Sequence, residues 1–534
     1  MVLNISAPYL WLPVSKNSPI VKLHFYNNGE KFQEIDIALG GANKDFDTYM
    51  DVSAYMGQEI EIVIEGSVAE EALRHITCHN ERVSNAYPFR PKLHFAPEIG
   101  WHNDPNGLVY ADGVYHMYYQ WNPYGVVWGN MHWGHAVSRD LLTWEHRPCA
   151  LVPNEYGTVY SGCGWQDKEN IAGFGKDALL FYYTAAGGSN QWSKAAGNLH
   201  TQRLAVSTDS GETLKRVEDM ALQDGERLQA GTGAVLEHIK GENRDPKVFY
   251  HEESCGYIMV LYLDGNEFAV FCSEDLMHWQ ETQRFVQEGM WECPDLFELS
   301  VENTDDEKKW VFWSADGYYV VGDFDGCRFT PQSGVQSAYA TKLPYAAQTY
   351  AGVKDRVISV AWLRLENDRG NYRGVMALPA ELGLRKLDEG YQICFQPVKE
   401  IQNIREMVGS IELSNERNST EVVFAGEALE VDLTWEAPKG GQTKLFAGET
   451  ELMVDFEENK LFYGAAEQEL DLCGEQLLNL KVLIDQEVIE FYGNDGTIYG
   501  AIEVEENLLG KSLRVENSTK LLRVEWYRLK MDEG

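Results

Sequence analysis

Short runs of alternating apolar and polar residues recur along the whole chain. Near both ends the alternation has a period of two, which is typical of strands with one buried face. In the middle, the runs are rich in aromatic and β-branched residues and end at Gly, Asp or Asn. No long stretch with the period of a helix competes with them, so the sequence predicts an all-β protein. Predicted strands include 20–25, 35–39, 60–64, 178–184, 309–313, 429–435, 480–484 and 522–526.

Changes in this pattern divide the chain into three predicted domains. Residues 1–88 form a small N-terminal β domain, with a short helix expected near 69–76. Residues 89–395 repeat a strand–turn–strand unit, and residues 405–534 have the rhythm of a C-terminal β-sandwich. Within the middle part, the pattern Ser-x-Asp-Leu-x-x-Trp occurs at 138–144 and 273–279, and its first half occurs at 207–209. A repeat of this kind favours a β-propeller with one copy per blade.

Composition narrows the class of partner. The 534 residues carry a formal net charge of −38, which disfavours nucleic acid and membrane surfaces and suits a neutral small molecule. The nine cysteines include no Cys-x-x-Cys pair, and the start of the chain has no signal-like segment. We therefore expect reduced thiols, a cytoplasmic location, no metal and no cofactor. The sequence is compatible with a homo-oligomer.

Three carboxylates stand beside prolines in short motifs. Asp104 lies in Asn-Asp-Pro-Asn-Gly, which predicts a tight turn, because Pro lacks an N–H and Gly readily takes positive φ. Asp245 follows Arg244 in Arg-Asp-Pro, and Glu292 begins Glu-Cys-Pro-Asp. Cleavage of a sugar through an oxocarbenium-like state needs a nucleophilic carboxylate and a carboxylic acid.

The residues fit these roles in one arrangement. We assign Asp104 as the nucleophile, Glu292 as the acid/base and Asp245 as the group that bonds sugar hydroxyls in the transition state. Arg244 is expected to keep Asp245 ionised. The three carboxylates are 141 and 47 positions apart, so they meet only if the fold brings distant strand ends to one axis, as a propeller does.

The ordered set of motifs resembles glycoside hydrolase family 32, which contains invertases, inulinases and levanases. The family's Trp-x-Asn-Asp-Pro-Asn-Gly motif matches 101–107, and its Arg-Asp-Pro and Glu-Cys-Pro-Asp motifs match 244–246 and 292–295. The N-terminal segment resembles an extra β domain of some bacterial levanase-like members. Supporting matches are 119–123, 128–135, 160–162, 345–350, 376–382 and 485–491.

The resemblance implies a five-bladed β-propeller followed by a β-sandwich, and a retaining, double-displacement mechanism with the roles given above. It implies an exo-acting β-fructofuranosidase that removes terminal non-reducing β-D-fructosyl units from sucrose, fructo-oligosaccharides or fructans. The positions that match the family's fructose pocket are Asn103, Gln120, Trp128, Tyr160, Ser161 and Arg244.

Several alternatives stay open at this point. A fructosyltransferase would use the same fructosyl-enzyme intermediate, and a fructan-binding protein would use none. An inverting hydrolase of a related propeller family is disfavoured by the intact motif around Asp104. His132 and His135 could suggest a metal pair, but without a third ligand a structural role is favoured. The chain also lacks the acidic residues that many members carry near 337–344, which bears on the preferred substrate.

Overall fold

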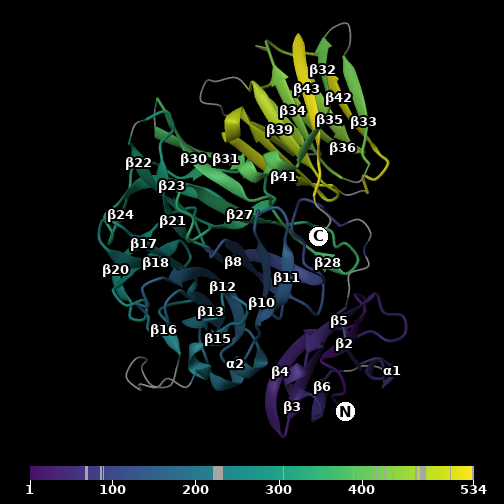
Figure 1. Ribbon diagram of the computed structural model, residues 1–534, viewed down its shortest axis with the longest axis vertical. Helices are drawn as coiled ribbons and strands as arrows, with labels where there is room; N and C mark the ends of the chain where they lie inside the picture. The colour runs from purple at the N-terminus through teal and green to yellow at the C-terminus, as the bar shows by residue number, and fades with distance from the viewer. Residues whose placement is uncertain are drawn as a thin grey trace.

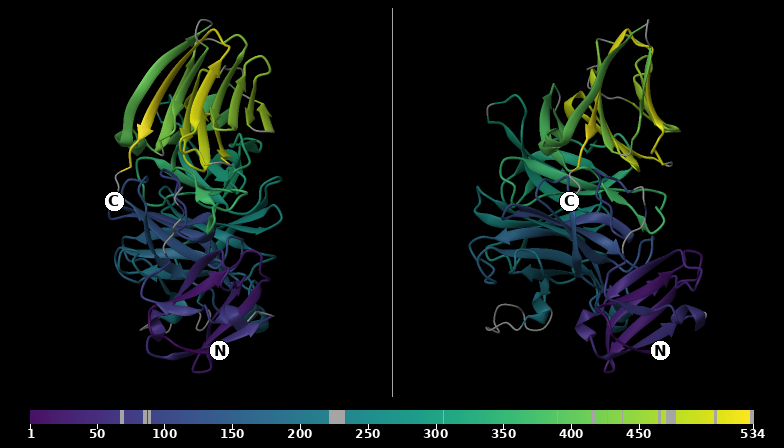
Figure 2. Two further views of the ribbon diagram at one scale, coloured as in Figure 1. Left: turned by 90° about the vertical axis from the view of Figure 1, so that its right-hand side faces the viewer. Right: turned by 45° about the vertical axis from the view of Figure 1, so that its right-hand side comes forward.

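In the computed structural model, nearly all of the described regular secondary structure is β-strand, and it forms three parts (Figure 1). The purple N-terminal part lies at one end, the teal and green part in the middle, and the yellow-green C-terminal part at the other end (Figure 2). The predicted boundary between residues 88 and 89 lies outside the described residues, so the predicted domain limits stay a prediction. Cys473 also lies outside the described residues. The structure describes residues 1–66, 70–83, 87, 90–220, 233–304, 306–388, 390–414, 418–425, 427–436, 438–463, 466–469, 477–504 and 507–531.

Two small antiparallel sheets make up the N-terminal part, and their apolar faces enclose a core that includes Leu10, Phe25 and Ile62. Of the helix predicted near 69–76, the described residues contain only a short turn, α1 (Glu70–Leu73), and residue 69 is outside them. The strand order is β1 (Val2–Asn4), β6 (Glu59–Glu65), β3 (Val21–Asn27) and β4 (Glu30–Ile37) in one sheet, and β5 (Phe46–Asp51), β2 (Tyr9–Val14) and β7 (Thr77–His79) in the other, with η1 (Ser53–Tyr55) after β5.

Five sheets follow, and apart from β28 each is antiparallel and made of strands that are close in sequence. The first contains β8 (Gly100–Ala111), β9 (Val114–Asn122), β10 (His132–Ser138) and β11 (Glu145–Leu151), with β28 (Tyr372–Arg373) parallel to β8. The second contains β12 (Thr158–Asp167), β13 (Ala178–Ala186), β14 (Thr201–Ser207), β15 (Lys215–Arg216) and β16 (Ala234–Leu236), with α2 (Gln191–Ala196) and η2 (Val217–Asp219) in its connections. The third contains β17 (Arg244–His251), β18 (Gly256–Asp264), β19 (Glu267–Ser273) and β20 (Gln280–Val286).

The last two sheets complete the middle part. The fourth contains β21 (Asp295–Ser300), β22 (Lys308–Trp313), β23 (Tyr318–Phe324), β24 (Phe329–Pro331) and β25 (Gln336–Ser337). The fifth contains β26 (Pro344–Thr349), β27 (Val357–Leu363), β29 (Val375–Met376), β30 (Ala380–Leu387) and β31 (Gly390–Pro397). The first strands of neighbouring sheets contact one another, β12 with β8 and β17, and β26 with β8 and β21. These sheets are the five blades of the predicted propeller, and β8, β12, β17, β21 and β26 are their inner strands.

The repeated Ser-x-Asp pattern has the same structural role in blades 1, 2 and 3. Each copy forms the turn between the third strand of its blade and the next one, where the Asp carboxylate accepts backbone N–H groups. Asp140 Oδ1 accepts from Thr143 at 2.7 Å, and Asp275 Oδ1 accepts from His278 at 2.8 Å. Asp209 Oδ1 accepts from the N–H of Thr213 at 3.0 Å. The repeat therefore marks blades, as predicted.

The C-terminal part consists of two six-stranded sheets packed face to face, a β-sandwich with core residues such as Leu433 and Phe491. The all-β fold class is thus as predicted. The β-sandwich is joined to the propeller through η3 (Lys399–Ile404). One sheet has the order β32 (Arg405–Ser414), β43 (Leu521–Leu529), β34 (Ala428–Trp435), β39 (Asn479–Ile484), β40 (Val488–Gly493) and β41 (Ile498–Glu503), and the other β33 (Ser419–Val423), β42 (Ser512–Asn517), β35 (Gln442–Ala447), β36 (Thr450–Asp455), β37 (Lys460–Tyr463) and β38 (Ala466–Glu469), with η4 (Asn494–Gly496) between β40 and β41.

A buried ionic contact joins the sandwich to the start of the propeller. Asp485 Oδ2 accepts the backbone N–H groups of Leu93 at 2.7 Å and His94 at 3.1 Å. The His94 ring lies between Asp485, at 3.1 Å, and Glu490, at 3.3 Å. Burial alone would lower the pKa of His94, but hydrogen bonds to these carboxylates raise it to about 10. The motif at 485–491 therefore has a structural role between domains.

Candidate active site

Four inner strands of the propeller, and the segment just before the remaining inner strand, each bring one polar side chain to a common site. Asp104 lies on β8, Ser161 on β12 and Asp245 on β17. Glu292 stands three residues before β21, and Tyr345 is the second residue of β26. Hydrogen bonds and short contacts connect all five through neighbouring residues. The structure therefore brings together the three carboxylates that the sequence singled out.

The predicted turn at Asp104 is wrong, because this residue lies inside the twelve-residue strand β8. The pairing of β8 with β9 shifts register on both sides of Pro105, and Gly107 has a φ of +56°. β8 is an inner strand that pairs with β28 only at Gly100 and Trp101, so at Pro105 the edge that faces away from β9 has no partner in β28. The motif makes a bulged edge strand, and the bulges aim the carboxylate.

Both oxygens of Asp104 accept hydrogen bonds. Ser161 Oγ donates to Oδ2 at 2.6 Å, and Asn103 Nδ2 donates to Oδ1 at 3.0 Å. The Trp101 indole N–H donates to Asn103 Oδ1 at 2.9 Å and so fixes the orientation of that amide. Burial, together with the charge of Glu292, raises the pKa of Asp104, and the two donated bonds oppose this. The arrangement presents a carboxylate whose position is set from two blades.

Asp245 is the most deeply buried of the three carboxylates, with 4% exposure and a φ of +64°. Its N–H donates to Thr184 Oγ1 at 3.0 Å, and its Oδ2 accepts the Cys293 N–H at 3.0 Å. Burial raises its pKa to about 7, and the charges of Glu292 and Asp104 add to this effect. The expectation that Arg244 keeps Asp245 ionised is therefore corrected, because burial and like charges outweigh the single cation.

Arg244 binds Glu292 rather than Asp245 as its nearest partner. Its Nη2 lies 2.7 Å from Glu292 Oε2, whereas its Nε is 3.7 Å from Asp245 Oδ2. The guanidinium also lies over the Tyr262 ring, 4.7 Å from its centroid. On the other side of Glu292, the Tyr345 hydroxyl donates to Oε1. Both oxygens of Glu292 are thus oriented by neighbouring side chains.

Cys293 connects the carboxylates at the centre of the site. Its Sγ lies 3.5 Å from Asp245 Oδ2 and 3.7 Å from Asp104 Oδ2. Burial, with the surrounding negative charges, raises the pKa of this thiol well above its ordinary value. The neutral S–H can therefore donate weakly to either acid, which suits a supporting neighbour and not a nucleophile.

A buried ion pair lies beside the site and accounts for the last residue of Glu-Cys-Pro-Asp. Asp295 Oδ2 is 3.0 Å from Lys247 Nζ and accepts the N–H and the hydroxyl of Thr349, each at 2.8 Å. These residues belong to blades 3, 4 and 5. The pair fixes the strands that carry the reacting groups.

The remaining predicted pocket residues lie around blades 1 and 2. Gln120 is buried and donates to the carbonyl of Val159 at 2.9 Å. Trp128 is 56% exposed on the loop between β9 and β10, and its ring meets Tyr160 edge-on at 6.1 Å. Burial raises the pKa of Tyr160 to about 12, so its hydroxyl is neutral. Contact of these residues with a sugar stays a prediction.

Sequence reasoning assigned no role to Tyr345, Thr184 or Trp101, which hold the three acids or their neighbours. The signal for Tyr345 was available, since it begins the matched segment 345–350. His132 and His135 have separate partners, which fits the structural role favoured from the sequence. His132 Nδ1 binds the carbonyl of Asn130, and the His135 ring stacks on Tyr118 at 4.1 Å.

Comparison with known proteins places the chain among the glycosidases. The family model described as "Glycosyl hydrolases family 32 N-terminal domain" matches residues 94–397. The levanase of Bacillus subtilis is 33% identical over 463 residues, which are 76% of this chain and 65% of that protein. The chain thus spans slightly less than two thirds of that relative. The extracellular exo-inulinase of Aspergillus niger is 30% identical, over 72% of this chain and 79% of that protein.

Solved structures share the fold. The exo-inulinase of Aspergillus awamori aligns with a TM-score of 0.69 at 24% identity, over 84% of this chain and 99% of that one. A glycoside hydrolase family 32 protein of Bifidobacterium adolescentis aligns with a TM-score of 0.68 at 19% identity, over 99% of both chains. The second alignment includes the N-terminal β domain. Because the family model covers more than half of its length, this chain belongs to glycosyl hydrolases family 32.

Proposed function

We propose that this protein is a retaining exo-β-fructofuranosidase that releases terminal non-reducing β-D-fructosyl units from sucrose or fructo-oligosaccharides. The observation that carries the proposal is the convergence of Asp104, Asp245 and Glu292 from three blades around Cys293 and Arg244. Relatives named levanase, exo-inulinase and invertase support fructosides as the substrate class.

In the first step, Asp104 attacks the anomeric carbon of the fructosyl unit. Ser161 and Asn103 hold its two oxygens, so the attacking lone pair has a defined direction. As the glycosidic bond breaks, Glu292 gives its proton to the leaving oxygen. The product of this step is a fructosyl ester on Asp104, and a separation of the two carboxyl groups of about 5–5.5 Å is typical of this chemistry.

In the second step, water attacks the same carbon. Glu292, now a carboxylate, takes a proton from that water, and the bond to Asp104 breaks, which restores both acids. Asp245 accepts hydrogen bonds from ring hydroxyls, and these bonds strengthen as positive charge develops on the ring. Arg244 and Tyr345 keep Glu292 in place through both steps.

The test is fructose release from sucrose, inulin-type and levan-type oligosaccharides by the native protein and by Asp104→Asn and Glu292→Gln. We expect each variant to lose at least about a thousandfold in kcat/KM, since it removes a group that reacts. Asp209→Asn, in a turn of blade 2 far from the acids in the chain, is the matched control and should keep full activity. Undiminished release by Asp104→Asn would contradict the mechanism.

Methanol as acceptor tests the stereochemistry, because a methyl fructoside does not mutarotate. Retention predicts methyl β-D-fructofuranoside, identified by ¹³C NMR, whereas inversion gives the α product. Formation of fructose oligomers at high sucrose concentration would instead indicate transfer to sugar as the main reaction.

We also propose that the protein works in a reducing, cytoplasmic environment. The support is that the eight cysteines within the described residues are free thiols and form no disulfide. Cell fractionation with thiol labelling tests this, and oxidised protein in an extracellular fraction would contradict it.

A further inference from the structure

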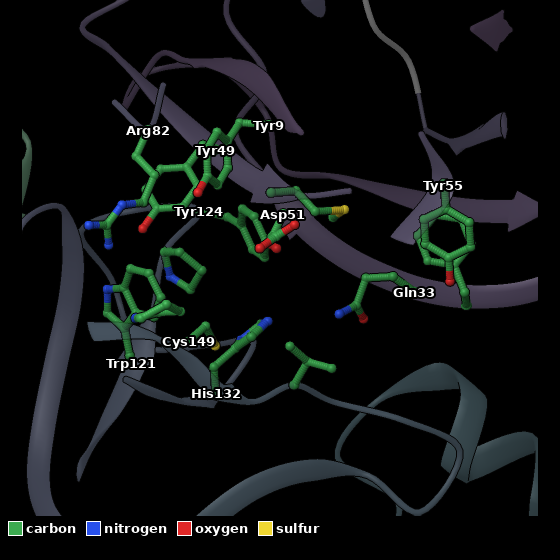
Figure 3. A pocket seen from close by; sticks show the side chains of 15 residues that line it. Tyr9, Gln33, Tyr49, Asp51, Tyr55, Arg82, Trp121, Tyr124, His132 and Cys149 are labelled. Carbon is green, nitrogen blue, oxygen red and sulfur yellow. The ribbon is translucent and has the colours of Figure 1, made fainter. Parts of the chain in front are cut away.

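A cavity of about 200 Å³ lies between the N-terminal β domain and blade 1 of the propeller (Figure 3). β2, β4, β5 and η1 supply one side of it, and β9, β10 and β11 supply the other. None of the carboxylates proposed for catalysis lines it. On β9, Gln120 and Trp121 point to opposite faces, as successive strand residues do, and only Trp121 lines the cavity.

Aromatic rings form much of the cavity wall. Phe32 and Tyr55 are stacked at 4.1 Å, with 30° between their planes, so each ring covers one face of the other and an outer face of the pair is what a ligand can contact. Tyr9 meets Tyr49 edge-on at 5.7 Å, and Tyr49 lies 6.4 Å from Trp121. Flat aromatic faces favour the C–H faces of a ring, and the hydroxyls of Tyr add polar contacts at the edges.

His132 supplies a buried acceptor without a partner. It is 1% exposed, and its Nδ1 binds the carbonyl of Asn130, which can only accept, so Nδ1 carries the hydrogen. Burial lowers the pKa of this ring to about 4, which makes it neutral at pH 7. Its Nε2 is then a bare acceptor, and it has no hydrogen-bond partner in the described part of the chain. In Figure 3 the ring reaches into the cavity.

Gln33 and Asp51 provide further polar groups at the cavity. Gln33 Oε1 accepts the N–H of Glu34 at 2.9 Å, which orients the amide and leaves its NH₂ group as a donor. Asp51 Oδ1 accepts the N–H of Ser53 at 2.8 Å, and its carboxylate extends toward the cavity from the N-terminal domain (Figure 3). The cavity thus offers acceptors and a donor at once. Hydroxyl groups match such a mixture, because each can donate and accept.

We propose that this cavity binds a single neutral sugar ring, at a site separate from the catalytic one. Binding pockets for drug-sized ligands measure about 300–1,000 Å³, so a cavity of about 200 Å³ suits one ring and not a chain. The net charge of −38 disfavours phosphorylated or acidic sugars. At the cavity itself the carboxylate of Asp51 is balanced by the guanidinium of Arg82, which also lines it and lies 3.3 Å from Glu98 Oε2, so the lining favours no charged ligand. The ligand would stack on the wall formed by Phe32 and Tyr55 and donate a hydroxyl to His132 Nε2.

The experiment uses the full chain with Glu292→Gln, which prevents turnover. Titration calorimetry with D-glucose, D-fructose and sucrose measures the number of binding sites and their affinities. Tyr55→Ala removes part of the aromatic wall, and Gln33→Leu removes the donor while keeping the volume. Tyr26→Ala, on β3 and outside the cavity lining, is the matched control. Thermal melting shows whether each variant is folded.

We expect at least one sugar to bind at a site whose affinity falls about tenfold or more in Tyr55→Ala and Gln33→Leu and stays unchanged in Tyr26→Ala. A crystal soaked with that sugar should show a ring against Tyr55. The proposal is overturned if no sugar binds up to about 50 mM outside the catalytic site, if folded cavity variants keep full affinity, or if only a cation such as tetramethylammonium binds there. Fructoside hydrolysis is measured in parallel with the same cavity variants in the chain that keeps Glu292, so a failure here leaves the proposed activity separately tested.

Discussion

Asp245→Asn is expected to change how the stability of the protein depends on pH. Burial, with the charges of Glu292 and Asp104, raises the pKa of Asp245 from 3.8 to about 7 in the folded protein. Between these two values the folded state binds more protons at this residue than the unfolded state does. The stability that this group contributes is therefore fully present below pH 3.8 and is lost as pH rises through about 7.

The magnitude follows from the two pKa values. Linkage with 3.8 for the unfolded chain and about 7 for the folded chain gives a contribution of about 3 kcal/mol at pH 5, which falls to nearly zero at pH 8. Because Asp245 is 4% exposed, solvent screening reduces this figure little. Asn at this position does not titrate. The stability of the native protein relative to the variant should thus fall by about 3 kcal/mol from about pH 5 to about pH 8.

Urea unfolding of the ligand-free native protein and the variant, at about pH 5 and about pH 8, measures this difference. Asp209→Asn is the control, because turn hydrogen bonds lower the pKa of Asp209, and its carboxylate is ionised in both states across this range. The control should therefore show a constant difference from the native protein. A difference for Asp245→Asn that stays constant within about 0.5 kcal/mol would refute the reasoning.

Two further substitutions test the support of the site. Tyr345→Phe removes the hydroxyl that donates to Glu292, and because such a bond to a charged group contributes about 1.5–3 kcal/mol, kcat/KM should fall about 10- to 150-fold; a loss below threefold would contradict the role. Asn130→Gly introduces a residue that tolerates the φ of +43° at this position. It removes the two side-chain hydrogen bonds, each 2.8 Å long, to the backbone N–H and carbonyl of Asp36. Since Asn130 helps to position the loop that carries Trp128, KM for sucrose should rise about fivefold with kcat unchanged. An unchanged KM would show that the loop keeps its position without Asn130.

The sequence predicted those parts of the fold that depend on local patterns. The alternation of apolar and polar residues located the strands. The turns at Asp140, Asp209 and Asp275 marked three blades, because each carboxylate accepts the backbone N–H of a residue three or four positions later, and such a contact depends only on the local sequence. The positions of Asp104 and Glu292 near one axis followed from the propeller. The turn predicted at Asp104 was wrong because Pro and Gly also suit a bulged edge strand, and only the pairing with β9 distinguishes the two.

Contacts between distant residues could not be predicted in this way. The pairing of Arg244 with Glu292 links positions 48 residues apart, and the contact of His94 with Asp485 links positions 391 apart. Neither leaves a periodic signal, and a neighbour in sequence, such as Asp245 beside Arg244, is a misleading guide. The pKa of Asp245 depends on the same distant contacts, because it is set by burial and by charges from two other blades.

The backbone at the acids shows why the whole propeller is needed to support the site. Asp245, Glu292 and Cys293 have φ values of +64°, +30° and +45°, a region that residues with a Cβ occupy at a cost of about 1–3 kcal/mol each. No glycine relieves this strain, since the side chains themselves are required for the contacts described. The Cys293 N–H bonded to Asp245 and the Asp245 N–H bonded to Thr184 offset part of it. These bonds join blades 2, 3 and 4, so the packing of complete blades, and not the motifs alone, keeps the acids in this conformation.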